Sequence, residues 1–254
     1  GQSGDPNGDS AATHDTKSWR ALAGQWLTTN FPNATINNIN AAIGESGTYL
    51  GTYRVQTDII SQEPDLLFIE YAINDNYFGS SESEAALMFE TIVREVKQAL
   101  PNCDVITVLT TDKAKVETTF AGDLFNTAKG HNAIAEAYKL PVVNLGLGLA
   151  KGIAETTMND KWWEDTATWK SYFYDDVHPY STGHSEYYKC MEEFLINNLL
   201  KTNFDGVETS RSNLPAVQSE HLLDGNRQNI FGADMKVELY NDGPVTVMLD
   251  SKEL

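Results

Sequence analysis

Residues 64–75 read PDLLFIEYAIND, and this stretch decides the fold. Pro64 and Asp65 open a continuous apolar run, and two polar residues, Asn74 and Asp75, follow where it ends. An apolar run without alternation is typical of a parallel strand that is buried on both faces of a sheet. We therefore predict a central parallel strand here, with Asn74 and Asp75 at its carboxyl end.

Further strand and helix patterns lie on both sides of this stretch. We predict strands in ATINNINAA (34–42), PDLLFIEYA (64–72), CDVITVLTT (103–111) and LPVVNLG (140–146). We predict helices near 16–30, 49–61, 82–100, 123–139 and 182–200. Strands that alternate with helices at this spacing form βαβ units, in which helices cover both faces of a parallel sheet. The predicted fold class is α/β, a three-layer α/β/α sandwich.

The last fifty residues differ in character from the rest. Residues 229–250, NIFGADMKVELYNDGPVTVMLD, hold short alternating runs around an Asn-Asp-Gly-Pro turn signal. Such a pattern predicts antiparallel β structure. We therefore divide the chain into a main domain at 1–203 and a short C-terminal β-rich extension at 204–254, which is incomplete if the β unit continues past Leu254.

The charge of the chain narrows the choice of partners. The formal net charge is −18 over 254 residues, whereas nucleic-acid binders need a basic surface to displace counterions. The same field repels anionic membranes and anionic substrates, and no apolar run is long enough to span a membrane. A neutral small molecule or a glycan ester is favoured, although solubility alone also explains the charge. The sequence does not set the oligomeric state.

The cysteines and the first residue of the chain give information about the cellular compartment of the protein. Cys103 opens a predicted strand and Cys190 lies in a predicted helix, so we expect two buried thiols rather than a disulfide framework. The chain begins at Gly1 rather than Met, so a leader could precede it and secretion stays open.

The strongest catalytic pattern is Tyr174-Asp175-Asp176-Val177-His178-Pro179. A carboxylate three residues before a histidine can reach its Nδ1 within a single turn. This contact fixes the tautomer and leaves Nε2 free to take a proton from a hydroxyl group. The alternative is a surface loop that contains a chance histidine.

Two other places qualify, because active groups in open α/β sheets gather at the carboxyl ends of strands. The amide of Asn74 could face a developing oxyanion, although Asn74 and Asp75 are also ordinary turn formers. The glycine in Gly44-Glu45 could let backbone N–H groups approach a ligand. An ordinary strand-to-helix turn is the alternative there.

Together these blocks resemble the SGNH (GDSL-type) hydrolase family, across about residues 1–200. The family's Asp-x-x-His block matches Asp175-Asp176-Val177-His178, with Pro179 following. Its Gly-x-Asn-Asp block resembles Ala72-Ile73-Asn74-Asp75, with alanine in place of glycine. Its second block, whose glycine N–H helps to form an oxyanion hole, resembles Asn40-Ala41-Ala42-Ile43-Gly44-Glu45, with Glu45 where that glycine usually falls.

The resemblance implies a flavodoxin-like sandwich and a serine carboxylic ester hydrolase that needs no metal or organic cofactor. His178 would be the general base and Asp175 its orienting acid. The oxyanion hole would comprise the Asn74 amide and the backbone at Gly44 and Glu45.

The resemblance also implies a substrate class. Many relatives act on short acyl esters, so we expect an acetyl ester on a carbohydrate, with Asp75 and Tyr174 beside the substrate. A glycan-binding scaffold without turnover, and a lipase or thioesterase with the same site, are the alternatives.

The nucleophile is the open point. Gly8-Asp9-Ser10 matches the family's Gly-Asp-Ser turn, but only eight residues separate Ser10 from Trp19. Ser3 leaves fifteen, which is closer to the loop that such enzymes carry. We therefore predict Ser3 among the residues present, with Ser10 or a serine upstream of Gly1 as alternatives.

Two further patterns have weaker functional interpretations. Asp5, Asn7 and Asp9 have the spacing that opens a calcium loop, but the turn glycine and the closing glutamate are replaced, so a polar loop with no metal is favoured. Five aromatic residues precede the histidine loop, and we expect them to pack the core rather than to form a platform for a sugar. They are Trp162, Trp163, Trp169, Tyr172 and Tyr174.

Overall fold

The computed structural model describes residues 16–200 and residue 218. The chain divides into two compact units, Gly1–His221 and Leu222–Leu254, and every described residue belongs to the first. Within the described residues, no helix combines the length and the apolar character needed to cross a membrane. Most of the predicted extension at 204–254 lies outside the described residues, so it stays a prediction.

The described elements alternate between helices and strands along the chain. In order they are α2 (Trp19–Asn30), α3 (Thr48–Arg54), η1 (Val55–Ile59), η2 (Ile60–Gln62), β1 (Leu66–Ile69), α4 (Ala72–Tyr77), α5 (Glu82–Ala99), β2 (Asp104–Leu109), α6 (Val116–Phe120), α7 (Asn126–Tyr138), β3 (Val142–Asn144), α8 (Leu145–Thr157), η3 (Trp162–Glu164), α9 (Thr166–Tyr172), α10 (Ser181–Leu195) and η4 (Ile196–Leu200).

The sheet of the described region has three parallel strands in the order β1-β2-β3. Phe68 pairs with Ile106 across the first ladder, and Val108 pairs with Val143 across the second. All three strands therefore end at the same edge of the sheet, and the segments that follow them gather there.

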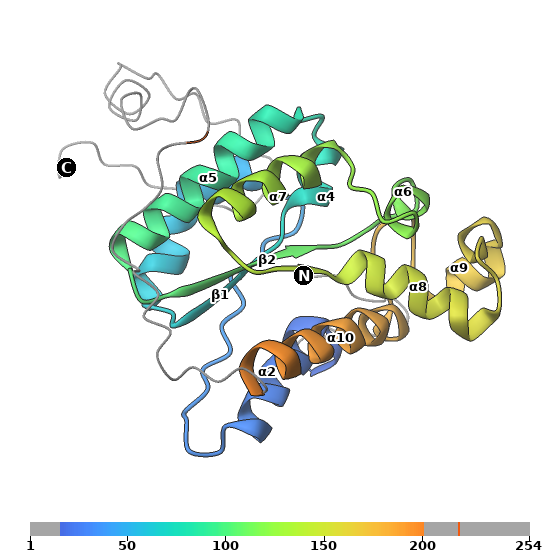
Figure 1. Cartoon of the computed structure of the whole chain (residues 1–254), viewed down its shortest axis with the longest axis horizontal. Helices are drawn as coiled ribbons and strands as arrows, with labels where there is room; N and C mark the ends of the chain where they lie inside the picture. Colours follow the sequence, from blue (N-terminus) through green and yellow to red (C-terminus); the bar gives the residue numbers. More distant parts are fainter. Residues whose placement is uncertain (1–15, 201–217, 219–254) are drawn as a thin grey trace, which may run out of the picture. The chain divides into compact units, whose positions relative to one another are not determined.

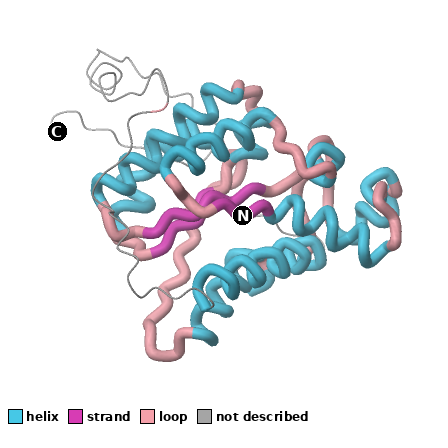
Figure 2. Tube along the Cα trace, viewed as in Figure 1, coloured by secondary structure: helices cyan, strands magenta, loops and turns pink. Residues whose placement is uncertain are grey.

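Helices cover both faces of this sheet, as Figures 1 and 2 show. Side chains alternate along β2, so that Val105 packs into the core under α5 and α7 while Ile106 packs toward α2, α8 and α10. The α5 helix begins with a capping box, in which Ser81 and Glu84 satisfy each other's backbone N–H groups. The predicted three-layer α/β/α sandwich is confirmed.

The strand predicted at 34–42 is wrong, because this segment is extended without strand pairing. A strand requires a ladder of backbone bonds to a neighbour. Here side chains supply the bonds instead: Arg54 donates to the Ala41 carbonyl at 2.9 Å, and the Ala42 N–H donates to Asn40 Oδ1 at 3.2 Å.

Both cysteines are free thiols, as predicted. Cys103 is buried at the start of β2, and Cys190 is partly buried on α10. Burial raises the pKa of Cys103 to about 11.

Candidate active site

The loop between α9 and α10 holds the predicted acid and base in direct contact. Asp175 Oδ2 lies 2.8 Å from His178 Nδ1. Because an ionised carboxylate only accepts hydrogen bonds, Nδ1 carries the proton and Nε2 is left as an acceptor. Nε2 has no hydrogen-bond partner among the described residues, and the His178 side chain is 52% exposed. The imidazole can therefore take a proton from a group that approaches from solvent.

The Asp175 carboxylate is fixed by its own loop. Its Oδ1 accepts from the Val177 N–H at 2.8 Å and from the His178 N–H at 2.7 Å. Burial opposes ionisation of this carboxyl, but these bonds and the bond to the His178 ring outweigh it and lower the pKa of Asp175. Asp175 is thus held as an anion that can stabilise an imidazolium.

An aromatic stack holds the loop from beneath. The rings of Trp162 and Trp169 are stacked 5.6 Å apart, and those of Trp169 and Phe173 are stacked 4.2 Å apart. Trp169 Nε1 donates to the Asp175 carbonyl at 2.8 Å. An antiparallel bridge between Phe173 and Pro179 closes the base of the loop. Trp169 is buried in the core, as predicted, and its bond to the Asp175 carbonyl, which the sequence did not reveal, also supports the loop.

The predicted packing of the aromatic cluster is correct for its buried members. Trp162 and Trp169 are fully buried, and Trp163 is nearly so, which leaves no platform for a sugar at these rings. Tyr174 differs, since it is exposed and its ring centroid lies 6.3 Å from that of His178. Tyr174 therefore stays a candidate substrate contact.

The second half of the candidate site is the turn between the segment at 39–47 and helix α4. Asn74 Nδ2 donates to the Ser46 carbonyl at 2.8 Å, which joins the two predicted oxyanion-hole segments. Glu45 has a φ of 55°, in the left-handed region that favours glycine. The conformation explains why the matching family position usually holds glycine, and it exposes the backbone of Gly44 and Glu45 in an irregular turn.

Asp75 lies beneath this turn rather than on it. Its side chain is 2% exposed. Its carboxylate accepts from the Thr48 N–H at 2.7 Å and from Thr48 Oγ1 at 2.9 Å, and His131 Nε2 lies 2.9 Å from Oδ2. The expectation that Asp75 contacts substrate does not fit this burial. The carboxylate instead ties the start of α3 and the middle of α7 to the Asn74 turn.

Thr48 and His131 were missed by the sequence analysis. Nothing in the sequence marks them, because their contact with Asp75 joins residues 27 and 56 positions away along the chain. The close approach at this junction requires a glycine, since a Cβ on Gly47 would lie 2.5 Å from Asp75 Oδ1.

The two halves of the site pack against a shared apolar cluster at the carboxyl edge of the sheet. The cluster contains Ala72 and Ile73, which precede Asn74 in the chain, and Leu109, which is the last residue of β2. Val177, the neighbour of His178, packs against the same cluster. A backbone bond from the Lys113 N–H to the Asp176 carbonyl, 2.9 Å long, ties the loop to the segment after β2.

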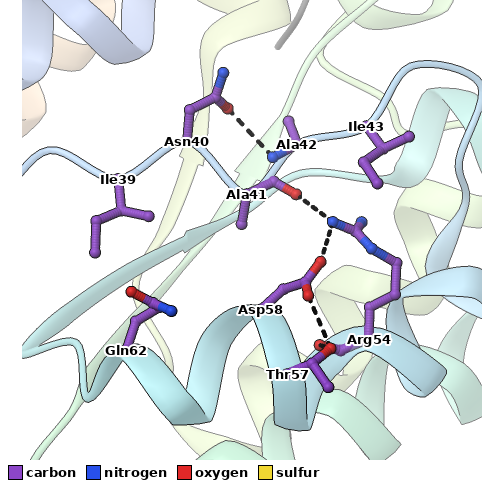
Figure 3. A pocket seen from close by; sticks show the side chains of 9 residues that line it. All are labelled: Ile39, Asn40, Ala41, Ala42, Ile43, Arg54, Thr57, Asp58 and Gln62. Carbon is purple, nitrogen blue, oxygen red and sulfur yellow. Dashed lines mark hydrogen bonds and ion pairs between the residues drawn. The ribbon is translucent and has the colours of Figure 1, made fainter.

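One cavity lies on the segment that leads into Gly44. It measures about 310 Å³ and is lined by residues 39–43 together with Arg54, Thr57, Asp58 and Gln62. Figure 3 shows the Arg54 guanidinium, which bonds both to the Ala41 carbonyl and to Asp58, and so pins this segment against the end of α3. None of the predicted catalytic residues lines the cavity.

The predicted nucleophiles Ser3 and Ser10 lie outside the described residues, as do Asp5, Asn7 and Asp9 of the possible calcium loop. Among the residues that the structure describes, no three His, Cys, Asp or Glu side chains gather as metal ligands.

Comparison with known families identifies the chain. A family model described as GDSL-like lipase/acylhydrolase matches residues 7–185. The chain belongs to this family of carboxylic ester hydrolases. The matched segment includes Ser10 and begins after Ser3.

Solved structures of esterases share the fold. A two-domain esterase active on acetylated mannans is 26% identical, with a TM-score of 0.63 over 79% of this chain and 47% of that protein. This chain therefore spans about half the length of that esterase. Axe2, an acetylxylan esterase from Geobacillus stearothermophilus, is 18% identical, with a TM-score of 0.54 over 69% of this chain and 80% of Axe2.

Shorter segments of the chain are similar to D-aminoacyl-tRNA deacylases. A D-aminoacyl-tRNA deacylase from Clostridium beijerinckii is 46% identical over 70 residues, which is 28% of this chain and 33% of that protein. The same enzyme from Christiangramia forsetii is 75% identical over 24 residues, which is 9% of this chain and 16% of that protein. The chain thus spans a third or less of these relatives.

Proposed function

We propose that this family member is a serine esterase that removes short acyl groups, acetyl above all, from neutral carbohydrate. The observation that carries the proposal is the pairing of Asp175 with His178 in an exposed loop, packed against the same apolar cluster as the turn that holds Asn74. A general base, its orienting acid and an amide donor are the groups that acyl transfer from an ester requires.

In the proposed mechanism, a serine hydroxyl of the N-terminal segment gives its proton to His178 Nε2 and attacks the ester carbonyl. The oxyanion that forms accepts hydrogen bonds from Asn74 and from the backbone at Gly44 and Glu45. Asp175 stabilises the imidazolium, which then protonates the leaving sugar alkoxide. Water, activated by the same imidazole, releases the carboxylic acid and restores the serine.

Two features support a neutral, short-chain substrate. The net charge of −18 disfavours anionic ligands, and the structurally similar mannan and xylan esterases named above act on acetylated polysaccharides. The similarity to the tRNA deacylases does not support the same activity here, because it covers a third or less of those relatives and the acidic chain opposes a polyanionic substrate.

Hydrolysis of p-nitrophenyl acetate and of acetylated mannan by the full chain tests the proposal. Acetate release that is lost in His178→Ala and that falls as the acyl chain lengthens is the expected result. Ligand binding with no hydrolysis of any ester would favour the scaffold alternative, and faster turnover of longer chains would favour a lipase.

The nucleophile is tested separately. We propose Ser3, on the spacing to Trp19, and Ser10 is the alternative that the family match includes. Ser3→Ala should abolish hydrolysis while Ser10→Ala retains it, and peptide mapping after labelling with a fluorophosphonate should place the adduct on Ser3. An adduct on Ser10 would reassign the role.

A further inference from the structure

Exposed apolar side chains gather around the predicted oxyanion-hole segments. Ten large hydrophobic side chains are exposed in the described residues, and six of them come from residues 43–78. These six are Ile43, Tyr49, Leu50, Tyr53, Tyr77 and Phe78. Exposed apolar side chains are unremarkable when scattered singly, but a concentration in one region marks a binding surface.

Tyr77 and Phe78 hold the most useful position in this group. Tyr77 ends α4 three residues after Asn74, which places the two side chains on one side of the helix, and Phe78 is the residue that caps this helix. Tyr77 is 79% exposed and Phe78 is 56% exposed. Their ring centroids lie 5.5 Å apart at an interplanar angle of 77°.

Phe78 also reaches the neighbouring segment. Its Cδ2 would lie 3.5 Å from a Cβ built on Gly47, next to the Ser46 carbonyl that Asn74 bonds. Phe78 therefore lies beside Gly47, the residue that follows the Ser46 carbonyl to which Asn74 donates. We expect the leaving group of a substrate whose carbonyl lies at Asn74 to extend over these rings.

We propose that Tyr77 and Phe78 form an aromatic platform that binds the sugar rings of the substrate. This inference rests on the proposed function and specifies how that site recognises its leaving group. A pyranose ring offers an apolar C–H face and a rim of hydroxyl groups, so it suits an exposed aromatic face bordered by water. Two rings set edge to face offer surfaces to adjacent sugar units.

The occupant is a neutral oligosaccharide rather than a lipid or a second protein. A short acyl group is too small to cover two exposed rings, and the net charge of −18 disfavours acidic ligands. Tyr174, exposed beside His178, offers a further ring on the other half of the site. The substrate chain would then be flanked by aromatic side chains from both halves.

The test compares two substrates and uses a matched control. We expect the ratio of kcat/KM on acetylated manno-oligosaccharide to kcat/KM on p-nitrophenyl acetate to fall about tenfold in Tyr77→Ala/Phe78→Ala. Tyr77→Phe should keep the wild-type ratio, because the ring remains. Met158→Ala removes an exposed apolar side chain at the C-terminal end of α8, outside this group of six, and should also keep the ratio.

A binding measurement separates failure of the platform from failure of the proposed function. Acetylated manno-oligosaccharide is titrated into His178→Ala protein with and without the two alanine substitutions, and the platform predicts about tenfold weaker binding without the rings. An unchanged ratio or an unchanged affinity overturns the platform even if the enzyme is an esterase. A loss of self-association in Tyr77→Ala/Phe78→Ala, with affinity for the sugar intact, would assign the rings to a second copy of the chain instead.

Discussion

Two aspartates, Asp75 and Asp175, each contact a histidine at close range, yet their surroundings differ throughout. The Asp175 side chain is 40% exposed, and its carboxylate bonds to Val177 and His178, two and three positions along its own loop. Asp75 is 2% exposed and bonds to Thr48 and His131, far away in the sequence. The same chemical pair is built locally in one region and by the tertiary fold in the other.

This difference indicates that the exposed Asp175 pair can react with a substrate and that the buried Asp75 pair has a structural role. In the proposed mechanism the Asp175–His178 pair exchanges protons with a substrate, and the His178 side chain is 52% exposed. The Asp75–His131 pair is buried. Both oxygens of the Asp75 carboxylate form hydrogen bonds with protein groups. On the proposed function, the loop carries the chemistry, whereas Asp75 holds the start of α3 and the middle of α7 against the Asn74 turn.

The largest expected effect is on the activity that depends on the Asp175–His178 pair. Asp175→Asn should lower kcat for p-nitrophenyl acetate by about 10⁴, because the imidazole loses its orienting anion. Asp176→Asn is the matched control, since the side chain of Asp176 is exposed and contacts Lys113 Nζ at 3.7 Å, and this variant should stay within about twofold of wild type. Equal losses in the two variants would contradict the assignment.

The next effect separates them by stability. Asp75→Ala should lower the free energy of unfolding by about 3 kcal/mol, because it leaves buried donors unpaired. Asp175→Ala should cost less than about 1 kcal/mol, since its loop is exposed. Urea denaturation followed by circular dichroism measures both. If Asp75→Ala unfolds at the wild-type midpoint, the structural role of Asp75 is wrong.

Predictability from the sequence follows the same division. The Asp175–His178 pair could be predicted because it needs only a three-residue spacing, and the parallel strands could be predicted from continuous apolar runs. The burial of Asp75 could not, because its partners come from α3 and α7. The strand expected at 34–42 failed for a related reason: a strand also needs a neighbouring strand to pair with, which a local stretch of sequence does not reveal.

A smaller effect tests how the reactive loop is positioned. Trp169→Phe keeps the stacked ring but removes the bond to the Asp175 carbonyl, and we expect kcat to fall about tenfold through misplacement of the acid and base. Trp162→Phe is matched to it, because this tryptophan donates to the Ala150 carbonyl at 3.0 Å, away from the loop. Steady-state kinetics should show little change of kcat in Trp162→Phe. Equal losses of kcat in the two variants would mean that Trp169 contributes only by packing.

A substitution in the turn at Gly44-Glu45 should change the stability of the protein modestly. Glu45→Gly should raise Tm by about 1–3 °C, because glycine accepts the left-handed conformation without a Cβ clash. Glu63 has a φ of 49° on a surface turn, so Glu63→Gly should raise Tm similarly. Only Glu45→Gly should also raise kcat/KM, as the approach to the backbone N–H opens. A Tm drop in both would show that the strain is absent.

The smallest effect concerns pH. The pKa of Asp175 is lower in the folded protein than in the unfolded chain, so its contribution to stability is present above the unfolded pKa, about 3.9. The contribution is lost as pH falls through the lower folded pKa. Tm measured from pH 6 to pH 2.5 should therefore fall about 1–2 °C further in wild type than in Asp175→Asn, a small difference because the pair is exposed. Parallel curves would contradict the lowered pKa.

The central claim is that the Asp175–His178 loop and the Asn74 turn face one reacting carbonyl. A crystal structure of the protein after reaction with a methyl phosphonofluoridate tests it most directly, because the tetrahedral adduct mimics the oxyanion. We expect a phosphonyl oxygen within about 3.2 Å of Asn74 Nδ2, and His178 Nε2 within about 3.2 Å of the serine oxygen. An adduct oxygen bonded to other groups, with His178 turned away, would contradict it.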